Sequence, residues 1–172
     1  MRHGLVAAVA AGLLTVGCGS PMSGAPALPA VADASRVDMC AVLTDAELTG
    51  LGIKLDTRQQ VNEIGVVGCQ WVGKPIRLSL ERDEDTIAAY QARRDAPAFT
   101  SFSDNRVNGR AGIQLSVERD RTDCAQLMDG GSVSLTVAVA PAFSLNPQPI
   151  DSCAEALRIA QMIEPRLPKG GT

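Results

Sequence analysis

Apart from Cys18, the sequence has four cysteines, and these set the strongest limit on how the chain folds: Cys40, Cys69, Cys124 and Cys153. An even number of cysteines in an exported chain is typical of a disulfide framework. Three pairings exist for four cysteines, and the sequence does not choose rigorously among them. The spacings favour Cys40–Cys69 and Cys124–Cys153, because each bridge then closes a loop of comparable size. In the chain-entropy model such a loop contributes roughly 3–4 kcal/mol to stability.

A zinc site and a redox site are the rival explanations for these cysteines. A four-cysteine zinc site normally shows close C-x2-C ligand pairs, and a redox dithiol shows C-x-x-C. Neither pattern occurs in the sequence. We therefore expect structural disulfides, with no metal site and no cofactor.

The first residues predict export. Arg2 precedes an unbroken apolar and small run at 5–16, LVAAVAAGLLTV. The run is shorter than the about 20 residues that span a bilayer, and it has the length and the cationic flank of a signal-peptide core. It ends at Gly17-Cys18, which resembles the bacterial lipobox, in which the cysteine is diacylated and becomes the mature N-terminus. Thr15 departs from that motif, which usually carries Leu, Val or Ile at this position.

The alternative is a simple signal peptide that is cleaved nearby. Cys18 would then either remain as a free cysteine or be removed with the peptide. We prefer lipidation, because an unpaired cysteine at the end of an apolar core otherwise has no evident role. Two acyl chains give a stable anchor without a transmembrane helix. The expected location is therefore the outer face of the cytoplasmic membrane. Removal of Arg2 leaves 15 of the 16 basic residues against 19 acidic ones, so no nucleic-acid partner is expected.

Composition divides the chain into four parts. Residues 1–17 are the expected signal peptide. Residues 18–35 hold the lipidated cysteine and a tether rich in Pro, Ala, Gly and Ser, which predicts flexibility. Residues 36–168 form one globular domain, and residues 169–172 form a C-terminal tail.

Residue patterns within the domain predict short helices and antiparallel strands. A capping box of Thr44 and Glu47 opens a helix that stops at Gly52. A second helix is expected over 86–94, with acids in its first turn and arginines in its last. A third is expected from Asp151 or Ser152 to about 164. Alternating or apolar runs predict strands at 65–72, 76–81, 113–118, 123–128 and 132–140. The expected fold class is α+β, a single domain with a mainly antiparallel sheet packed on one face by two or three helices.

Four short motifs, taken together, resemble a known family. They are DMCAVLT at 38–44, GCQW at 68–71, Cys124 before a strand hairpin, and Asp151-Ser-Cys153 opening a helix that finishes before Leu167-Pro168. Their order and spacing are similar to the actinobacterial lipoprotein domain of unknown function numbered 3558, over about residues 36–168. The resemblance implies an exported lipoprotein, supports the two sequential disulfides and brings no established activity. The common D-P-C start appears here as Asp38-Met39-Cys40.

The sequence offers no catalytic residue. The only histidine, His3, lies in the segment expected to be removed, so histidine-dependent triads and histidine metal sites are excluded from the processed chain. No G-x-S-x-G elbow, P-loop or dinucleotide motif is present. The acidic run at 83–85 lacks the alternating ligands of an EF-hand and is interpreted as a solvated helix N-terminus.

Three aromatic residues are candidates for contact with a ligand or a partner. Trp71 falls on the same strand face as Cys69, which is ordinary core packing around a disulfide, and ligand stacking is the less favoured hypothesis. Phe99 and Phe102 follow the second predicted helix in a proline-flanked stretch. They form either an exposed contact or a cover over the sheet edge.

Three functions remain open. The first is a non-catalytic envelope module that binds an envelope protein or a small apolar ligand. The second is a carboxylate- or Ser/Thr-dependent hydrolase acting on envelope material. The third is a purely structural role. The missing histidine, the tether and the lack of catalytic motifs favour the first.

Overall fold

The computed structural model describes residues 33–117, 123–143 and 149–169. The predicted signal peptide, Cys18 and nearly all of the tether lie outside these residues. Within the described chain, one sheet and three helices account for almost all regular structure.

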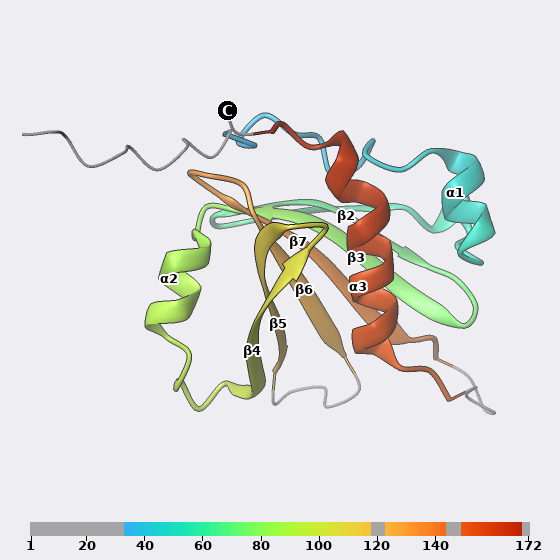
Figure 1. Cartoon of the computed structure of the whole chain (residues 1–172). Coiled ribbons are helices and arrows are strands. Elements are labelled where there is room, and N and C mark those ends of the chain that lie inside the picture. Colours follow the sequence, from blue (N-terminus) through green and yellow to red (C-terminus); the bar gives the residue numbers. More distant parts are fainter. Residues whose placement is uncertain (1–32, 118–122, 144–148, 170–172) are drawn as a thin grey trace, which may run out of the picture.

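Seven antiparallel strands form a single twisted sheet (Figure 1). Their order across the sheet is β1-β2-β3-β7-β6-β5-β4. The expected α+β class and mainly antiparallel sheet are confirmed. The strands are β1 (Gln59–Glu63), β2 (Val66–Val72), β3 (Ile76–Asp83), β4 (Phe99–Val107), β5 (Arg110–Val117), β6 (Cys124–Asp129) and β7 (Ser134–Pro141).

The principal core lies on one face of the sheet. Helix α3 (Ser152–Ile163) crosses β6 and β7 there (Figure 1). Its stripe of Ala156, Ile159, Ala160 and Ile163 is fully buried, because small and branched side chains at helical spacing face the strands. Leu48 of α1 (Asp45–Gly50) belongs to the same core. Two helices therefore pack on one face, as predicted.

The third helix, α2 (Ile87–Ala92), lies on the opposite face. Its Ile87 packs against Ile113, Leu115 and Leu127, which alternate along β5 and β6 with residues that face α3. Helix α2 contacts β5 and β6, and its Tyr90 hydroxyl donates to Asp83 at the end of β3 at 2.5 Å, so it covers that end of the second face. The described residues place no other α-helix on this face.

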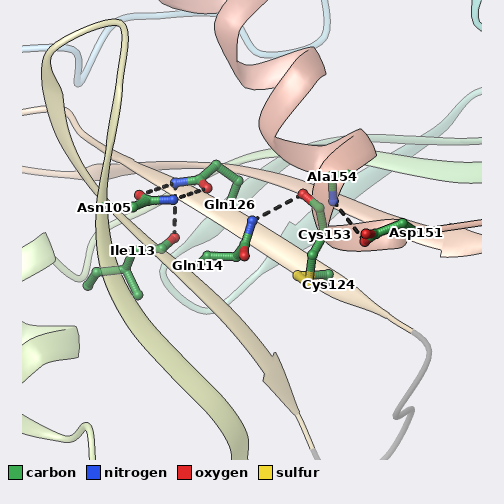
Figure 2. The surroundings of a disulfide bond; sticks show 8 residues. All are labelled: Asn105, Ile113, Gln114, Cys124, Gln126, Asp151, Cys153 and Ala154. Carbon is green, nitrogen blue, oxygen red and sulfur yellow. Dashed lines mark hydrogen bonds between the residues drawn. A yellow bond between two sulfur atoms is a disulfide. The ribbon is translucent and has the colours of Figure 1, made fainter.

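Both favoured disulfides are present, Cys40–Cys69 and Cys124–Cys153. The first attaches the segment before α1 to β2, and the second attaches β6 to the first turn of α3. Figure 2 shows a network of amides around the buried Gln126, beside the second bridge. Asn105 Nδ2 donates to Gln126 Oε1 at 2.7 Å, and Gln126 Nε2 donates back to Asn105 Oδ1 at 2.9 Å. Gln114 Nε2 donates to the Cys153 carbonyl at 3.1 Å, which links the sheet to the helix start.

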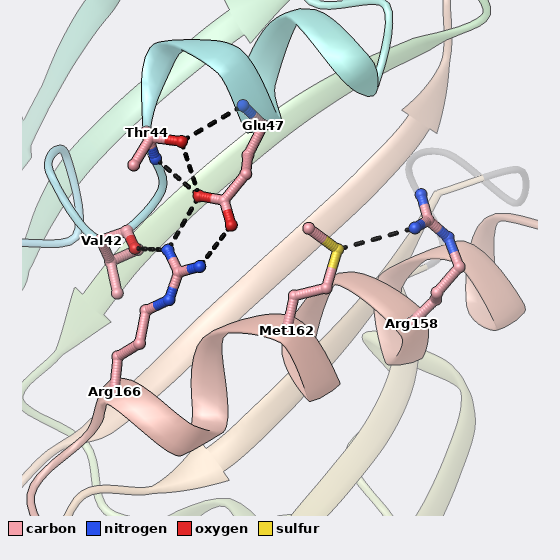
Figure 3. A network of polar contacts seen from close by, with 6 residues as sticks. All are labelled: Val42, Thr44, Glu47, Arg158, Met162 and Arg166. Carbon is pink, nitrogen blue, oxygen red and sulfur yellow. Dashed lines mark hydrogen bonds and ion pairs between the residues drawn. The ribbon is translucent and has the colours of Figure 1, made fainter.

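Most of the predicted helix ends agree with the structure. Thr44 and Glu47 form the predicted capping box, with each side chain accepting from the other residue's backbone N–H (Figure 3). Asp151 caps α3 by accepting from the Ala154 N–H at 3.0 Å. Helix α2 is shorter than predicted. It begins at Ile87, after the acidic residues 83–85, and ends at Ala92, before the two arginines, so neither charged group lies within it.

Strands β1 and β4 are absent from the predicted set. Both lie at the edges of the sheet, and most of their side chains are exposed or half-buried. An edge strand of this kind carries little of the apolar alternation that marks a strand in sequence.

Glu47 also joins α1 to the C-terminal turn η2 (Glu164–Arg166). The Arg166 guanidinium donates to both Glu47 oxygens and, at 2.7 Å, to the Val42 carbonyl (Figure 3). Hydrogen bonds from Arg166 and from Thr44 lower the pKa of Glu47 from 4.5 to about 2.

A carboxylate whose pKa is lowered on folding stabilises the fold at pH values above its ordinary pKa. This stability is lost as the pH falls through the pKa of the folded state. We therefore expect Glu47→Gln to lower the urea midpoint at pH 6, and this deficit to shrink as the pH falls from 4.5 to about 2. Asp45→Asn on the same helix is the control, since Asp45 makes no side-chain hydrogen bond among the described residues. A deficit that is equal at pH 6 and pH 2.5 would contradict this.

Candidate functional site

The three predicted contact aromatics lie on opposite faces of the sheet. Trp71 is 3% exposed and belongs to the principal core beside Cys69, which agrees with the core-packing interpretation. Phe99 and Phe102 lie half-buried in the cluster under α2, with ring centroids 5.6 Å apart. They cover the sheet and form no exposed pair. The structure therefore does not bring the three residues together as one site.

A pocket of about 280 Å³ opens on the part of the second face that α2 leaves free. We call it the sheet pocket. Its base comes from β2, β3 and β7, and its rim comes from the end of β2, the start of β1 with the turn before it, the residue before β6 and the segment after β7. Its lining includes Gln70, Val72, Arg77, Ser79, Glu81, Asp123, Ala138, Ala140 and Phe143.

Strand alternation explains this lining. In β3, Leu78 and Leu80 point into the principal core, so Ser79 and Glu81 point the other way. The neighbouring strand β7 places Ala138 directly opposite Ser79. A methyl side chain fills little space above the sheet, so a hollow remains beside the polar groups of β3.

The rim combines an exposed ring with a fixed cation. Phe143 is 82% exposed, and the Arg77 guanidinium lies over its ring at 4.2 Å from the centroid. Arg77 Nε also donates to the Pro141 carbonyl at 3.2 Å, and its Nη2 lies 3.8 Å from an Asp123 oxygen. These contacts hold the Arg77 charge at one end of the pocket.

Glu81 lies toward the other end of the pocket. Ser79 Oγ donates to Glu81 Oε1 at 2.5 Å. Burial, together with the negative charges of Glu63 and Asp83, raises the pKa of Glu81, while the hydrogen bond from Ser79 opposes this rise. Four residues of strand, about 13 Å, separate Glu81 from Arg77, so Arg77 does not neutralise it. Among the described residues no basic side chain pairs with Glu81.

A carboxyl group whose pKa is raised by burial weakens the fold once it ionises. The folded state then holds its proton more tightly than the unfolded state, so stability falls as the pH rises from the ordinary value of 4.5 toward the raised one. We expect Glu81→Gln to raise the thermal midpoint at pH 7 and to leave it nearly unchanged at pH 4. Glu84→Gln, an exposed acid just beyond β3, is the matched control. A lower midpoint for Glu81→Gln at pH 7 would assign Glu81 a stabilising role instead.

A second hollow, of about 360 Å³, lies between the segment before α1 and strands β1 and β2. Two of its charged side chains, Arg82 and Asp38, hold that segment. Arg82 Nη1 lies 3.4 Å from the Val37 carbonyl, and Asp38 Oδ1 accepts from the Cys40 N–H at 2.9 Å. We interpret it as a seam between two packed parts of the fold.

The described residues contain no group of three or more His, Cys, Asp or Glu side chains placed to hold a metal ion. None of the helices within them is long and apolar enough to cross a membrane. The sheet pocket gathers polar groups that sequence patterns identified only as the outward side of β3.

Comparison with known proteins identifies the family. Residues 13–166 match the family described as "Protein of unknown function (DUF3558)". The match covers most of the chain, so the chain belongs to this family. No curated protein and no solved structure gives a match.

Proposed function

We propose that this DUF3558 protein is a lipoprotein, anchored through a diacylated Cys18 to the outer face of the cytoplasmic membrane, whose domain is a non-catalytic binding module. The sheet pocket is its binding site, for an envelope protein or a small ligand. The observation that carries this proposal is a pocket on a sheet face that holds a half-buried carboxylate without a basic partner among the described residues.

The sequence supports the anchor. A cationic residue, an apolar core and Gly17-Cys18 follow one another as in lipoprotein precursors. The family match begins at residue 13, so it includes Cys18 and the tether along with the domain.

The two ends of the described chain lie near each other, at one end of the sheet (Figure 1). The Ala34 N–H donates to the Gly130 carbonyl at 2.8 Å, in the turn between β6 and β7. Arg110, at the same end of the sheet, donates to the Pro168 carbonyl at 2.8 Å. Strand β7 starts beside this turn and reaches the pocket rim at Pro141, about 23 Å away at the usual strand rise. The described chain thus begins at the end of the sheet that lies farther from Arg77 and Phe143, whereas Glu81, opposite Thr136 on β7, lies nearer to it.

The residues of the pocket favour binding over hydrolysis. A two-carboxylate hydrolase needs one acid and one base on either side of the bond that breaks. Glu81 and Asp123 are the two carboxylates among the described lining residues, and Asp123 lies beside the Arg77 guanidinium. The processed chain also has no histidine to serve as a base.

Native mass spectrometry of the lipidated protein, extracted gently from its own envelope, tests this proposal. We expect diacylglyceryl mass that disappears in Cys18→Ser, and a further adduct that disappears when Ala138→Leu fills the pocket. Ala154→Leu, on the exposed side of α3, is the matched control and should keep the adduct. A clean acylated monomer, or an adduct that persists in Ala138→Leu, would overturn the binding role. An unacylated Cys18 would overturn the anchor.

A further inference from the structure

We propose that the sheet pocket recognises a primary alkylammonium group and that Glu81 pairs with it. This inference rests on the proposed function, because it names the ligand chemistry of that same pocket. Three features support this pairing, namely the charge around Glu81, its position in the lining of the pocket, and the change from polar to apolar lining along the pocket.

The charge around Glu81 is negative. Asp83 lies two residues farther along β3 and on the same face of the sheet. Glu63 of β1 adds a second negative charge. The basic residue of the pocket, Arg77, lies at the far rim beside Asp123. A ligand cation would therefore give Glu81 the positively charged partner that the described residues do not supply. An anionic ligand would be repelled there.

Glu81 itself lines the sheet pocket and is half-buried. Gly68 lies directly opposite on β2 and has no side chain, and Thr136 lies opposite on β7. The side chains directly beside Glu81 are therefore short or absent, and its carboxylate is reached from the pocket that it lines.

The lining suits an ammonium on an apolar stem. An ammonium donates three hydrogen bonds and needs several acceptors close together. Glu81, Ser79 and Gln70, which lies opposite Ser79 on β2, offer oxygen atoms on one face of the sheet. Farther along the face, Val72 is 44% exposed and the Phe143 ring is 82% exposed. A methylene stem running from Glu81 toward this rim would lie on apolar surface.

A free amine and the lysine side chain of a partner protein share this chemistry. The test therefore uses the full-length lipoprotein in detergent micelles with three probes, each titrated by ligand-observed NMR. N-acetyl-lysine-N-methylamide represents the side chain, and n-butylammonium represents the free amine. N-acetyl-norleucine-N-methylamide, which has the stem without the charge, is the control.

We expect saturable binding of an ammonium probe that weakens at least tenfold in Glu81→Gln and stays within twofold in Glu84→Gln. The thermal midpoint of Glu81→Gln is measured in parallel, so that loss of binding is not mistaken for unfolding. Equal binding by butylammonium and the lysine probe would indicate a small amine, and binding by the lysine probe alone would indicate a partner side chain. Equal binding by the norleucine probe, or unchanged binding in Glu81→Gln, would overturn the inference.

Failure of this inference is distinguishable from failure of the proposed function. If no ammonium probe binds while native mass spectrometry finds an adduct lost in Ala138→Leu, the pocket is a site for another ligand class. If neither the probes nor the native adduct are found, both the ligand class and the binding role are wrong.

Discussion

Replacing Cys124 and Cys153 together with alanine is expected to lower the free energy of unfolding by roughly 3–4 kcal/mol. The two cysteines are separated by 29 residues along the chain, and their bridge attaches β6 to the first turn of α3. Without it the unfolded chain gains the entropy of an open loop. Small domains are stabilised by only about 5–15 kcal/mol, so this is a large share of the total.

Urea unfolding followed by circular dichroism measures this loss, and the second bridge provides the comparison. Cys40 and Cys69 are also separated by 29 residues, so loop closure alone predicts an equal effect for Cys40→Ala with Cys69→Ala. A difference between the two pairs would measure what each bridge adds in the folded state. A loss below about 1 kcal/mol for both pairs would contradict the loop-closure account.

Arg110→Met is expected to lower the free energy of unfolding by about 3–5 kcal/mol, because it leaves a buried carboxylate without its cation. The Arg110 side chain is 8% exposed and that of Glu164 is 11% exposed, with 3.2 Å between Nε and Oε1. Arg110 also donates to the Asp129 and Pro168 carbonyls, each at 2.8 Å. One guanidinium thus joins β5, the end of β6 and the C-terminal segment.

Arg106→Met is the matched control for Arg110. Arg106 lies in the neighbouring strand β4, is exposed, and donates to the Gly109 carbonyl at 2.7 Å. We expect it to cost less than about 0.5 kcal/mol. Adding Glu164→Leu to Arg110→Met should recover part of the loss, since no unpaired charge then remains buried. Equal effects of Arg106→Met and Arg110→Met in urea unfolding would show that the buried ion pair is not important.

Local patterns were sufficient to predict much of this fold. The alternation in IRLSLE gave the core of β3, and Thr44 with Glu47 gave the start of α1, because both signals come from neighbouring residues. Cysteine spacing favoured the correct pairing. Edge strands β1 and β4 were missed, since a strand that buries few side chains shows little apolar alternation.

The candidate site was not predictable from the sequence in the same way. The outward positions of β3 looked like an ordinary solvated face. Whether Glu81 is exposed or half-buried depends on neighbours that lie far away in the sequence, since the strands on either side of it are β2 and β7. The free part of the second face depends on where α2 lies, and sequence periodicity does not assign a helix to a face. Phe99 and Phe102 were left open for the same reason, because their cover is α2 itself.

Site-specific photocrosslinking in the anchored protein tests most directly whether the sheet pocket is the binding surface. A p-benzoylphenylalanine in place of Val72 lies at the pocket rim, and one in place of Gln161 lies on the exposed side of α3, on the opposite face of the sheet. After irradiation in the intact envelope, we expect a discrete adduct from position 72 and none from position 161. An adduct from position 161 with none from position 72 would contradict this expectation.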